Sequence, residues 1–377
     1  MSAFTVRRVE AFVFRCPIAV PVVTSFGTMR DRPMVLVRVE DDQGVVGWGE
    51  AWCNFPSVGA EHRARLVESV MAPLLQGQRF DSPEAAFKRL TEATAVLAIQ
   101  SGERGPVSQA IAALDIAMWD GAARRAGVPL WRMLGGASPS VRVYASGLNP
   151  DGAVEVALAR RAEGYAAFKL KIGFGAARDI ANLRALRGAL GRDTPLMVDA
   201  NQGWTLDQAL ETVASFAEFG LDWLEEPLRA DRPWREWQEL QRSTKIPLAA
   251  GENFADDAAF TTALDVGALR VIQPDMAKWG GFTGCAPVAR GILVAGQRFC
   301  PHFLGGGIGL LASAHLLAGI GGDGLLEVDA NPNPLRSLTC GPVDRIVGGT
   351  TTLEERPGLG VDIELEALQE YAVAVHA

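Results

Sequence analysis

Side chains suited to metal-assisted acid–base chemistry recur at nearly even intervals along the second half of this 377-residue chain. They are separated by 23 to 28 residues and comprise Lys171, Asp199, Glu225, Glu252, Asp275, His302 and Glu327. Each follows a short apolar run rich in Val, Ile, Leu or Phe, which is typical of a buried parallel strand. The interval matches one strand plus its crossover helix. The spacing therefore predicts one ring of functional groups at the strand ends, converging on one cavity.

Three of these residues are acids that follow consecutive predicted strands. Asp199, Glu225 and Glu252 are expected to converge, and three close carboxylates would raise one another's pKa unless a cation lies among them. Hard oxygen ligands without Cys or an adjacent His favour Mg²⁺. Ordinary salt-bridge partners are the alternative for such acids. Glu225 and Glu226 are adjacent, and strand alternation alone does not decide which of them points inward.

Candidate bases flank these acids on both sides. Lys169 and Lys171 lie two apart in FKLKIG, so we expect both on one strand face. Two ammonium groups buried near a divalent cation would depress each other's pKa, and this makes one of them a usable base. Asp275 is expected to fix the imidazole tautomer of His302 and to support its protonated form. The alternatives are a solvated lysine pair and a structural histidine.

This combination suits the removal of a proton from the carbon α to a carboxylate. Such a carbon acid is very weak, so coordination of the carboxylate oxygens by the metal must stabilise the ene-diolate. Glu327 would help only if protonated, which requires neighbouring acids to raise its pKa. Asn201, two residues beyond Asp199, is expected to contact a substrate hydroxyl. The remaining histidines, at positions 62, 315 and 376, receive no role.

The chain around these residues has the alternating pattern of an α/β barrel. After residue 136, eight apolar runs from VRVYASG (141–147) to GLLEV (324–328) alternate with helical stretches. This pattern predicts a (β/α)₈-type TIM barrel, whose active site lies at the carboxyl ends of its strands. We expect the barrel to span residues 131–328.

The residues on either side of the barrel have different patterns. Strands are expected at 4–15 and 34–40, and helices with apolar residues at three- and four-residue spacing follow from about residue 60. We therefore predict an α+β N-terminal capping domain over residues 1–130. The C-terminal segment, 329–377, is expected to pack on the barrel or on the capping domain and to complete the latter.

Bulk composition excludes several classes of partner. A net charge of −8 and a pI near 5.2 argue against nucleic acid and anionic membranes. No stretch approaches the roughly 18 apolar residues of a membrane span. The N-terminus lacks a signal-peptide apolar block, and five scattered cysteines favour reduced thiols. We therefore expect a cytoplasmic protein that acts on a small-molecule carboxylate.

Taken in order, the motifs resemble the enolase superfamily and, within it, the mandelate racemase subgroup, which also includes muconate lactonizing enzymes. The resemblance covers nearly the whole chain. The motifs are KLK at 169–171, MVDAN around Asp199, LEEP around Glu225, AGEN around Glu252, QPDMAKWGG around Asp275, PH at 301–302, LLE at 325–327 and an N-terminal VGWGE. A single Lys-x-Lys is weak evidence, but seven motifs in order at the right spacing are specific.

The resemblance implies a role for each matching residue. One Mg²⁺ per active site would be bound by Asp199, Glu225 and Glu252, which selects Glu225 over Glu226. The catalytic residues would be Lys171 as the base on one face, Lys169 near the substrate carboxylate, His302 with Asp275 on the other face, and Glu327 as the electrophilic acid.

The resemblance also implies that capping-domain loops, here about 18–33 and 51–59, select the substrate. The candidate contacts are Thr24, Ser25, Phe26, Trp52, Asn54 and Phe55. The sequences KIGFG, PHFLGGG and NPNPLR resemble those of sugar-acid dehydratases and galactarolactone cycloisomerase. The loops carry few charges for a diacid substrate. Family members are often dimers or octamers, so a homo-oligomer is expected.

Bases on both faces permit several reactions. We rank a dehydratase of a sugar acid or related hydroxy acid first, a cycloisomerase of a sugar lactone next, and a racemase or epimerase of a hydroxy or amino acid derivative third. A zinc-dependent amidohydrolase barrel would need His-x-His on its first strand, which this chain lacks. A non-catalytic barrel that only binds a ligand is a distant alternative.

Overall fold

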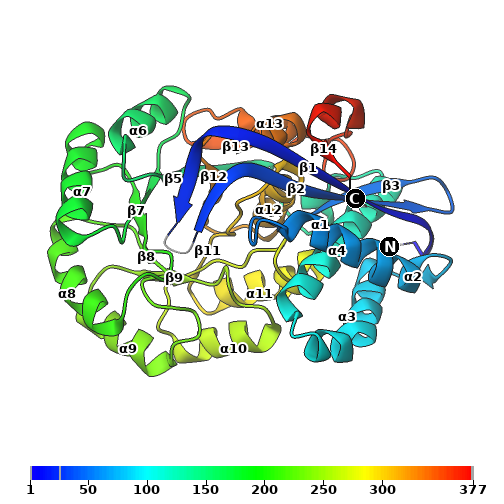
Figure 1. Ribbon diagram of the computed structural model, residues 1–377, viewed down its shortest axis with the longest axis horizontal. Coiled ribbons are helices and arrows are strands. Elements are labelled where there is room, and N and C mark those ends of the chain that lie inside the picture. Colours follow the sequence, from blue (N-terminus) through cyan, green and yellow to red (C-terminus); the bar gives the residue numbers. More distant parts are fainter. Residues whose placement is uncertain (1, 25–26, 375–377) are drawn as a thin grey trace.

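The computed structural model describes residues 2–24 and 27–374, which form two sheets and their surrounding helices (Figure 1). One sheet is antiparallel, with strand order β14-β1-β2-β3, and β4 pairs with β1. The other contains eight strands in the order β11-β10-β9-β8-β7-β6-β5-β12, and β13 is added to β5. Among the described helices, none is long and apolar enough to cross a membrane.

The antiparallel sheet belongs to the N-terminal part of the chain. Its strands are β1 (Phe4–Thr24), β2 (Gly27–Asp41) and β3 (Val46–Ala51), with the two-residue β4 (Arg79–Phe80). Helices α1 (Gly59–Leu66), α2 (Ala72–Leu75), α3 (Pro83–Gln100) and α4 (Arg104–Ala126) follow. Helix α4 lies directly against β3. The two elements are so close that a Cβ added at Gly47 or Gly49 would lie 2.0 or 1.9 Å from a carbonyl oxygen of α4. The glycines of VGWGE therefore permit this close packing.

Residues 18–33 were expected to form a loop, and this expectation was wrong for most of the segment. The antiparallel pairing of β1 with β2 resumes at Val22 opposite Met29 and continues to Thr24 opposite Gly27. The register shifts between Pro17 and Val22, a stretch in which proline removes backbone donors. The result is a two-stranded ribbon that reaches over the barrel mouth (Figure 1). Ser25 and Phe26, two of the predicted contacts, lie outside the described residues.

The parallel sheet provides the TIM-barrel-type fold that the alternating pattern predicted. Its strands are β5 (Ser140–Leu148), β6 (Phe168–Lys171), β7 (Leu196–Asp199), β8 (Leu224–Glu225), β9 (Leu248–Ala250), β10 (Val271–Ile272), β11 (Arg298–Phe299) and β12 (Leu326–Asp329). The helices around it are α6 (Ala153–Ala162), α7 (Ala176–Leu190), α8 (Leu206–Phe216), α9 (Trp234–Ser243), α10 (Asp257–Val266), α11 (Gly281–Val294) and α12 (Gly307–Ile320). Strands β11 and β12 end the hydrogen-bonded path, and the Leu325 N–H joins them by donating to Cys300 Sγ.

A buried layer with one residue from each barrel strand or its end closes the interior below the mouth. Its members are Tyr144, Ala167, Met197, Trp223, Ala249, Val271, Cys300 and Leu325. Side chains alternate along a strand, so residues two positions further on point into the same interior, one level nearer the mouth. This layer therefore lies directly below the functional side chains and closes the bottom of the site.

The C-terminal segment contacts both sheets. After α13 (Pro334–Thr339), strand β13 (Thr350–Thr352) pairs with β5 of the barrel, and β14 (Ala372–Val373) pairs with β1 of the antiparallel sheet. Gly358 O also accepts a hydrogen bond from Leu130 N, just after α4. The segment thus fastens the two parts of the molecule together.

Candidate active site

The functional residues stand at two levels of the barrel mouth, whereas the spacing predicted one ring. The lower level lies two residues beyond the buried layer and consists of Ser146, Lys169, Asp199, Glu225, Gly251, Gln273, His302 and Glu327. Lys171 and Asp275 lie two residues further on, and Glu252 follows β9 one residue out of this alternation. The single-ring expectation failed because even spacing along the chain does not fix height along the barrel axis.

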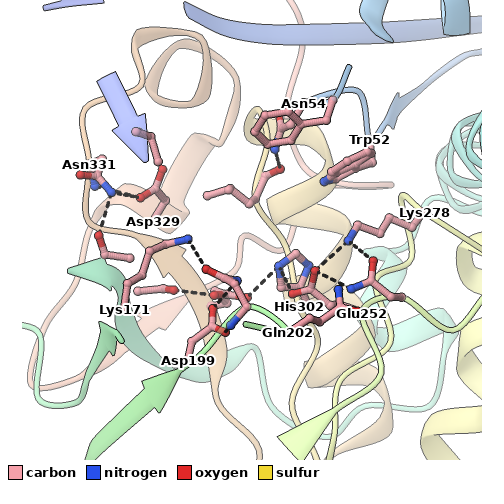
Figure 2. A pocket seen from close by; sticks show the side chains of 18 residues that line it. Trp52, Asn54, Lys171, Asp199, Gln202, Glu252, Lys278, His302, Asp329 and Asn331 are labelled. Atoms are coloured by element: carbon pink, nitrogen blue, oxygen red, sulfur yellow. Dashed lines mark hydrogen bonds and ion pairs between the residues drawn. The ribbon is translucent and has the colours of Figure 1, made fainter. Parts of the chain in front are cut away.

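A cavity of about 190 Å³ opens above this level (Figure 2). Its lining includes nine predicted residues, namely Lys171, Asp199, Asn201, Glu252, His302, Glu327, Trp52, Asn54 and Phe55. The lining also includes Gln202, Asn253, Lys278, Asp329 and Asn331, which the sequence interpretation missed. Lys169, Glu225 and Asp275 are buried behind this lining.

Two of the missed residues follow from a signal that was present in the sequence. Asp329 and Asn331 lie two and four residues beyond Glu327, so strand alternation places them on its side, nearer the mouth. The same rule had been applied to Lys169 and Lys171, but not to the last strand.

Lys169 is buried among carboxylates instead of beside a second ammonium group. Its Nζ lies 2.5 Å from Glu225 Oε1, 2.8 Å from Glu327 Oε1 and 4.0 Å from Asp199 Oδ2. Burial alone would lower the pKa of Lys169, but Glu225 and Glu327 outweigh it and raise the pKa well above its ordinary value. The expected mutual depression of the lysine pKa values is therefore wrong for Lys169, which is a fixed cation.

Lys171 is oriented by the end of the neighbouring strand. Its Nζ donates to Asn201 Oδ1 at 3.1 Å, and the Asn201 amide nitrogen donates to Asp199 Oδ2 at 2.9 Å. Asn201 adopts a left-handed conformation with φ 43°, and its backbone N–H donates to Asp199 Oδ1 at 2.7 Å. Asn201, predicted as a substrate contact, thus also holds Asp199 and Lys171 in register.

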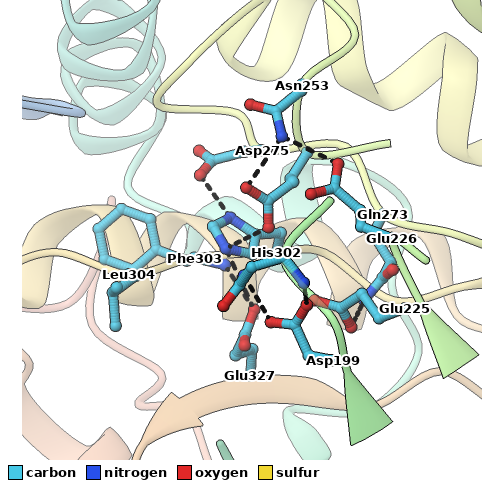
Figure 3. Close-up of polar contacts among 12 residues, drawn as sticks. Asp199, Glu225, Glu226, Asn253, Gln273, Asp275, His302, Phe303, Leu304 and Glu327 are labelled. Carbon is cyan, nitrogen blue, oxygen red and sulfur yellow. Dashed lines mark hydrogen bonds and ion pairs between the residues drawn. The ribbon is translucent and has the colours of Figure 1, made fainter. Parts of the chain in front are cut away.

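His302 lies in a carboxylate-rich environment on the other side (Figure 3). Nδ1 is 2.7 Å from Asp275 Oδ2, whereas Nε2 is 2.9 Å from Glu252 Oε2 and 3.7 Å from Glu327 Oε2. Burial opposes charging, but Glu252 and Glu327 outweigh it, and the pKa of His302 is raised well above its usual range. The predicted contact between Asp275 and His302 is present.

Lys278 is the main cation that the sequence interpretation overlooked, although it lies within QPDMAKWGG. Its Nζ lies 2.9 Å from Glu252 Oε1 and 4.7 Å from the centre of the Trp52 ring. Burial would raise the pKa of Glu252, but His302 and Lys278 lower it well below its ordinary value. Trp52 N donates to Ala277 O at 3.2 Å, so the capping segment contacts the loop that carries Lys278.

Glu225 and Glu226 point to different partners. Glu225 accepts from Gln273 Nε2 at 2.6 Å and Trp223 Nε1 at 3.0 Å, in addition to Lys169. Glu226, in a left-handed conformation with φ 39°, accepts from Asn253 Nδ2 at 2.9 Å. Burial raises the pKa of Glu225 to about 7.

Glycine at position 251 makes room for the contact between Gln273 and Glu225. A Cβ at Gly251 would lie 2.8 Å from Gln273 N, and φ is +138°. No other residue would fit this position without moving the end of β10.

The donor set of the predicted metal centre fits a hard divalent cation. Asp199, Glu225 and Glu252 offer carboxylate oxygens from consecutive strand ends, and Asp199 and Glu252 both affect the pKa of Glu225. Within residues 2–24 and 27–374, however, no three acidic, His or Cys side chains already form a chelating group. The reason is that Lys169, His302 and Lys278 now hold these carboxylates. Binding an ion requires at least Glu252 to exchange a partner.

Glu327 does not have the raised pKa that the sequence interpretation required. Its Oε1 accepts from Ser146 Oγ at 2.5 Å, and its Oε2 accepts from Phe303 N at 3.2 Å. Burial would raise the pKa of Glu327, but Lys169 and His302 outweigh it and lower the pKa. In this arrangement Glu327 is a carboxylate, and the expectation of a protonated donor is wrong.

The outer part of the cavity has one charged and one largely apolar wall (Figure 2). Asp329 on the first wall pairs with the buried Arg32 at 2.7 Å and accepts from Asn331 Nδ2 at 2.8 Å. Trp52 and Asn54 form the opposite wall, where Asn54 Nδ2 donates to Leu304 O at 2.8 Å. Thr24, a predicted contact, ends β1, but its side chain lies outside the described part.

Two family models match the chain. The model for the mandelate racemase/muconate lactonizing enzyme N-terminal domain matches residues 8–135, and the enolase C-terminal domain-like model matches residues 153–367. Together they include the antiparallel sheet and nearly the whole barrel.

Similar proteins are found among curated sequences and solved structures. D-galactarolactone cycloisomerase from Agrobacterium fabrum is 34% identical, covering 90% of this chain and 91% of its own. For 3,6-anhydro-alpha-L-galactonate cycloisomerase from Streptomyces coelicolor the identity is 30%, with coverage of 98% and 99%. A mandelate racemase/muconate lactonizing enzyme structure from Bordetella bronchiseptica is 56% identical, with a TM-score of 0.94 and coverage of 98% and 100%.

A racemase structure from Streptomyces coelicolor, solved with bound magnesium, is 29% identical, with a TM-score of 0.89 and coverage of 98% and 100%. The match of both family models agrees with the geometry of the barrel mouth. The chain therefore belongs to the mandelate racemase/muconate lactonizing enzyme group of the enolase superfamily and is an enzyme of the lyase or isomerase type.

Proposed function

We propose that this protein is a Mg²⁺-dependent enzyme that removes the proton α to the carboxylate of a sugar acid or sugar lactone and then expels the oxygen substituent on the β-carbon. The observation that carries the proposal is the position of Lys171 and His302 on opposite sides of one cavity, with Asp199 between and below them (Figure 2). A substrate carbon held between them would expose one face to each side chain.

The proposed roles follow from the surroundings of the two side chains. Lys171 Nζ, oriented by Asn201, accepts the α-proton as a general base. His302 is held as an imidazolium beside Glu252 and Asp275, so it donates a proton to the departing β-oxygen. The resulting enol then tautomerises to a 2-oxo acid. Lys169, a fixed cation buried behind the cavity lining beside Glu225, would attract the substrate carboxylate.

We propose that Asp199, Glu225 and Glu252 hold one Mg²⁺, with Glu226 supporting the site through Asn253. The ion, when bound, would neutralise the carboxylate oxygens on which negative charge develops. The magnesium bound in the related racemase structure supports this assignment. Replacing Glu225 by Gln should weaken Mg²⁺ binding measured by calorimetry more than the matched change Glu226→Gln.

The substrate we propose has a single carboxylate and an uncharged, hydroxylated tail. Asp329 lines the outer wall and would repel a second carboxylate, and Arg32 beside it is already held in a buried ion pair with Asp329. The amides of Asn331 and Asn54 offer hydrogen bonds to neutral groups. This makes the racemisation of a diacid derivative the weaker alternative.

Cycloisomerisation of a sugar lactone or anhydro sugar acid is the outcome we favour. Both curated relatives named above are cycloisomerases, and their sequences match nearly the full length of this chain. Dehydration of an open-chain sugar acid is the second candidate. The two share the same proton abstraction and differ only in whether the expelled oxygen remains attached to the product.

A panel of sugar acids and lactones incubated with enzyme and Mg²⁺ in D₂O tests the proposal. We expect deuterium at the α-carbon of recovered substrate and at the former β-carbon of the 2-oxo acid product, and mass spectrometry distinguishes an isomeric product from one that has lost water. Chelation of the metal should abolish both signals, and added Mg²⁺ should restore them. An absence of α-exchange across aldonates, lactones and anhydro acids would contradict the proposal.

We further propose a homo-oligomer, dimer or octamer, in the cytoplasm. All five cysteines are buried and none forms a disulfide, which supports a reducing compartment. Light scattering coupled to size exclusion would measure the assembly.

A further inference from the structure

A buried carboxylate from the antiparallel sheet lies beneath the loop that carries His302. Glu50, the penultimate residue of β3, is 1% exposed. Its Oε1 accepts from Gly306 N at 2.5 Å, and its Oε2 accepts from Gly309 N at 2.8 Å. Both oxygens of one side chain are thus used to hold the start of α12, more than 250 residues away in sequence.

The glycines of the loop create the space that Glu50 occupies. A Cβ at Gly305 would lie 2.9 Å from Glu50 Oε1 and 2.6 Å from the Phe303 ring. At Gly306 it would lie 2.8 Å from the same oxygen, and at Gly309 it would lie 2.3 Å from Phe303. The Gly-rich sequence is therefore shaped around one carboxylate and one aromatic ring.

The segment that follows Glu50 contacts the same side of the cavity at two more points. Asn54 Nδ2 donates to Leu304 O at 2.8 Å, and Trp52 N donates to Ala277 O at 3.2 Å. Phe303, next to His302, donates its N–H to Glu327 Oε2. Residues 50–54 thus fasten the loops of both His302 and its partner Asp275.

The opposite side of the cavity has a different support. The contacts of Lys171 described above come from β6 and the end of β7 within the barrel, and Asn201 is their centre. Among residues 2–24 and 27–374, no contact joins Glu50 to Lys171. A change at Glu50 should therefore act on one side of the substrate.

We propose that Glu50 is a positioning residue that places His302, and not Lys171, beside the reacting part of the substrate. The inference rests on the proposed function, because it assigns the base Lys171 and the acid His302 to opposite faces. Glu50 does not line the cavity, and it acts through the backbone of residues 303–309.

The test compares two readouts in D₂O: α-proton exchange in a substrate sugar acid, which needs Lys171, and product formation, which also needs the proton of His302. Lys171→Ala should abolish both, and His302→Asn should abolish product formation alone. In Glu50→Gln, an amide NH₂ faces one of the two glycine N–H groups, so we expect product formation to fall about 10- to 100-fold and α-exchange to stay within about twofold. Amide hydrogen exchange over residues 303–309, read by mass spectrometry, should increase.

Asp120→Asn is the matched control. Asp120 is also a fully buried carboxylate that accepts from two backbone N–H groups, those of Trp48 and Leu359, but it lies away from the cavity. This variant should lose stability and retain both exchange and product formation. If Glu50→Gln does not fold, Glu50→Asp, which keeps the charge and shortens the reach, gives the same comparison.

Equal loss of exchange and product formation, or no loss of either, would overturn the positioning role while leaving the proposed function intact. If the wild-type enzyme neither exchanges the α-proton nor forms product, the proposed function itself is wrong and the role of Glu50 falls with it. Unchanged amide exchange over 303–309 in Glu50→Gln would also overturn the inference.

Discussion

The two sides of the cavity support their candidate bases in different ways. Lys171 stands on a barrel strand and donates to one neutral amide oxygen, that of Asn201. His302 stands on a loop, lies between Asp275 and Glu252, and is charged because those carboxylates outweigh its burial. The charged His302 on one side suits a general acid, and Lys171 with its neutral partner on the other side suits a general base.

The difference extends to the elements behind each side chain. The Lys171 side is built within the barrel, whereas the His302 side also depends on β3 and the residues after it, through Glu50, Trp52 and Asn54. The antiparallel sheet therefore does more than cover the mouth. It helps to position the His302 side of the cavity, whereas the barrel strands position the Lys171 side.

Removing either side chain should give the largest effect and test the comparison most directly. We expect Lys171→Ala and His302→Asn each to lower overall turnover about 1,000-fold or more, because each step needs its own proton transfer. Exchange at the α-carbon in D₂O should be lost in Lys171→Ala and persist in His302→Asn. Loss of exchange in both variants would show that the two sides do not act separately.

Asp275→Asn should have the next largest effect, confined to the His302 side. An amide can no longer balance the imidazolium at 2.7 Å, so we expect turnover to fall at least about 100-fold. Exchange from the Lys171 face should change little. Asp256→Asn, an N-cap of α10 distant from His302, serves as the control for loss of a carboxylate.

Lys278→Met should have a smaller effect that is read best in metal binding. Without the ammonium group 2.9 Å from Glu252, this carboxylate is freer to bind a cation, so we expect Mg²⁺ to bind about five- to tenfold more tightly. Calorimetry measures the change, with the exposed Lys245→Met as the control. Weaker Mg²⁺ binding in Lys278→Met would show that Glu252 is not a ligand.

His315 provides a contrast with His302 that should affect stability and leave activity unchanged. It is equally buried, but its Nδ1 accepts from Trp131 N and its Nε2 donates to Leu359 O, and burial lowers its pKa from 6.5 to about 4. As the pH falls from 6.5 to 4, His315 is therefore protonated in the unfolded chain before it is protonated in the folded protein. Over this window the free energy of unfolding should decrease by about 3 kcal/mol on account of this residue.

Urea unfolding at pH 7 and pH 5, compared between the wild type and His315→Gln, isolates that contribution. The variant keeps an acceptor and a donor but does not titrate, so its stability should fall less on acidification. A wild type and variant with the same pH dependence would show that His315 is already protonated or exposed in the folded protein.

Much of the fold was predictable because it depends on local order along the chain. Apolar runs alternating with helical stretches specify a parallel barrel, and the barrel-type fold is confirmed. The ribbon at 18–33 was missed because prolines interrupt its pattern, although the pairing resumes at Val22. The domain boundaries and the catalytic and metal-binding roles stay predictions, even though the structure brings most of the predicted residues to one cavity.

The charge states of the site residues were predicted poorly from the sequence. The pKa of Lys169 was expected to be depressed by Lys171, and Glu327 was expected to help only if protonated, yet Lys169 and Glu327 form an ion pair at 2.8 Å. Which lysine faces which carboxylate depends on neighbours from strands far apart in the sequence. Those distances exist only once β6 and β12 lie on either side of β5.

The sequence by itself determined the kind of fold, the residue types at the strand ends and the chemistry those types can perform, because the parity and spacing of strands are local properties of a chain. Tertiary structure alone decided the two levels of the site, the ion pairs that set each pKa, the part played by Lys278 and the contact of Glu50 with the His302 loop. These depend on distances of a few ångströms between distant segments, and electrostatic and hydrogen-bond energies change steeply over that range.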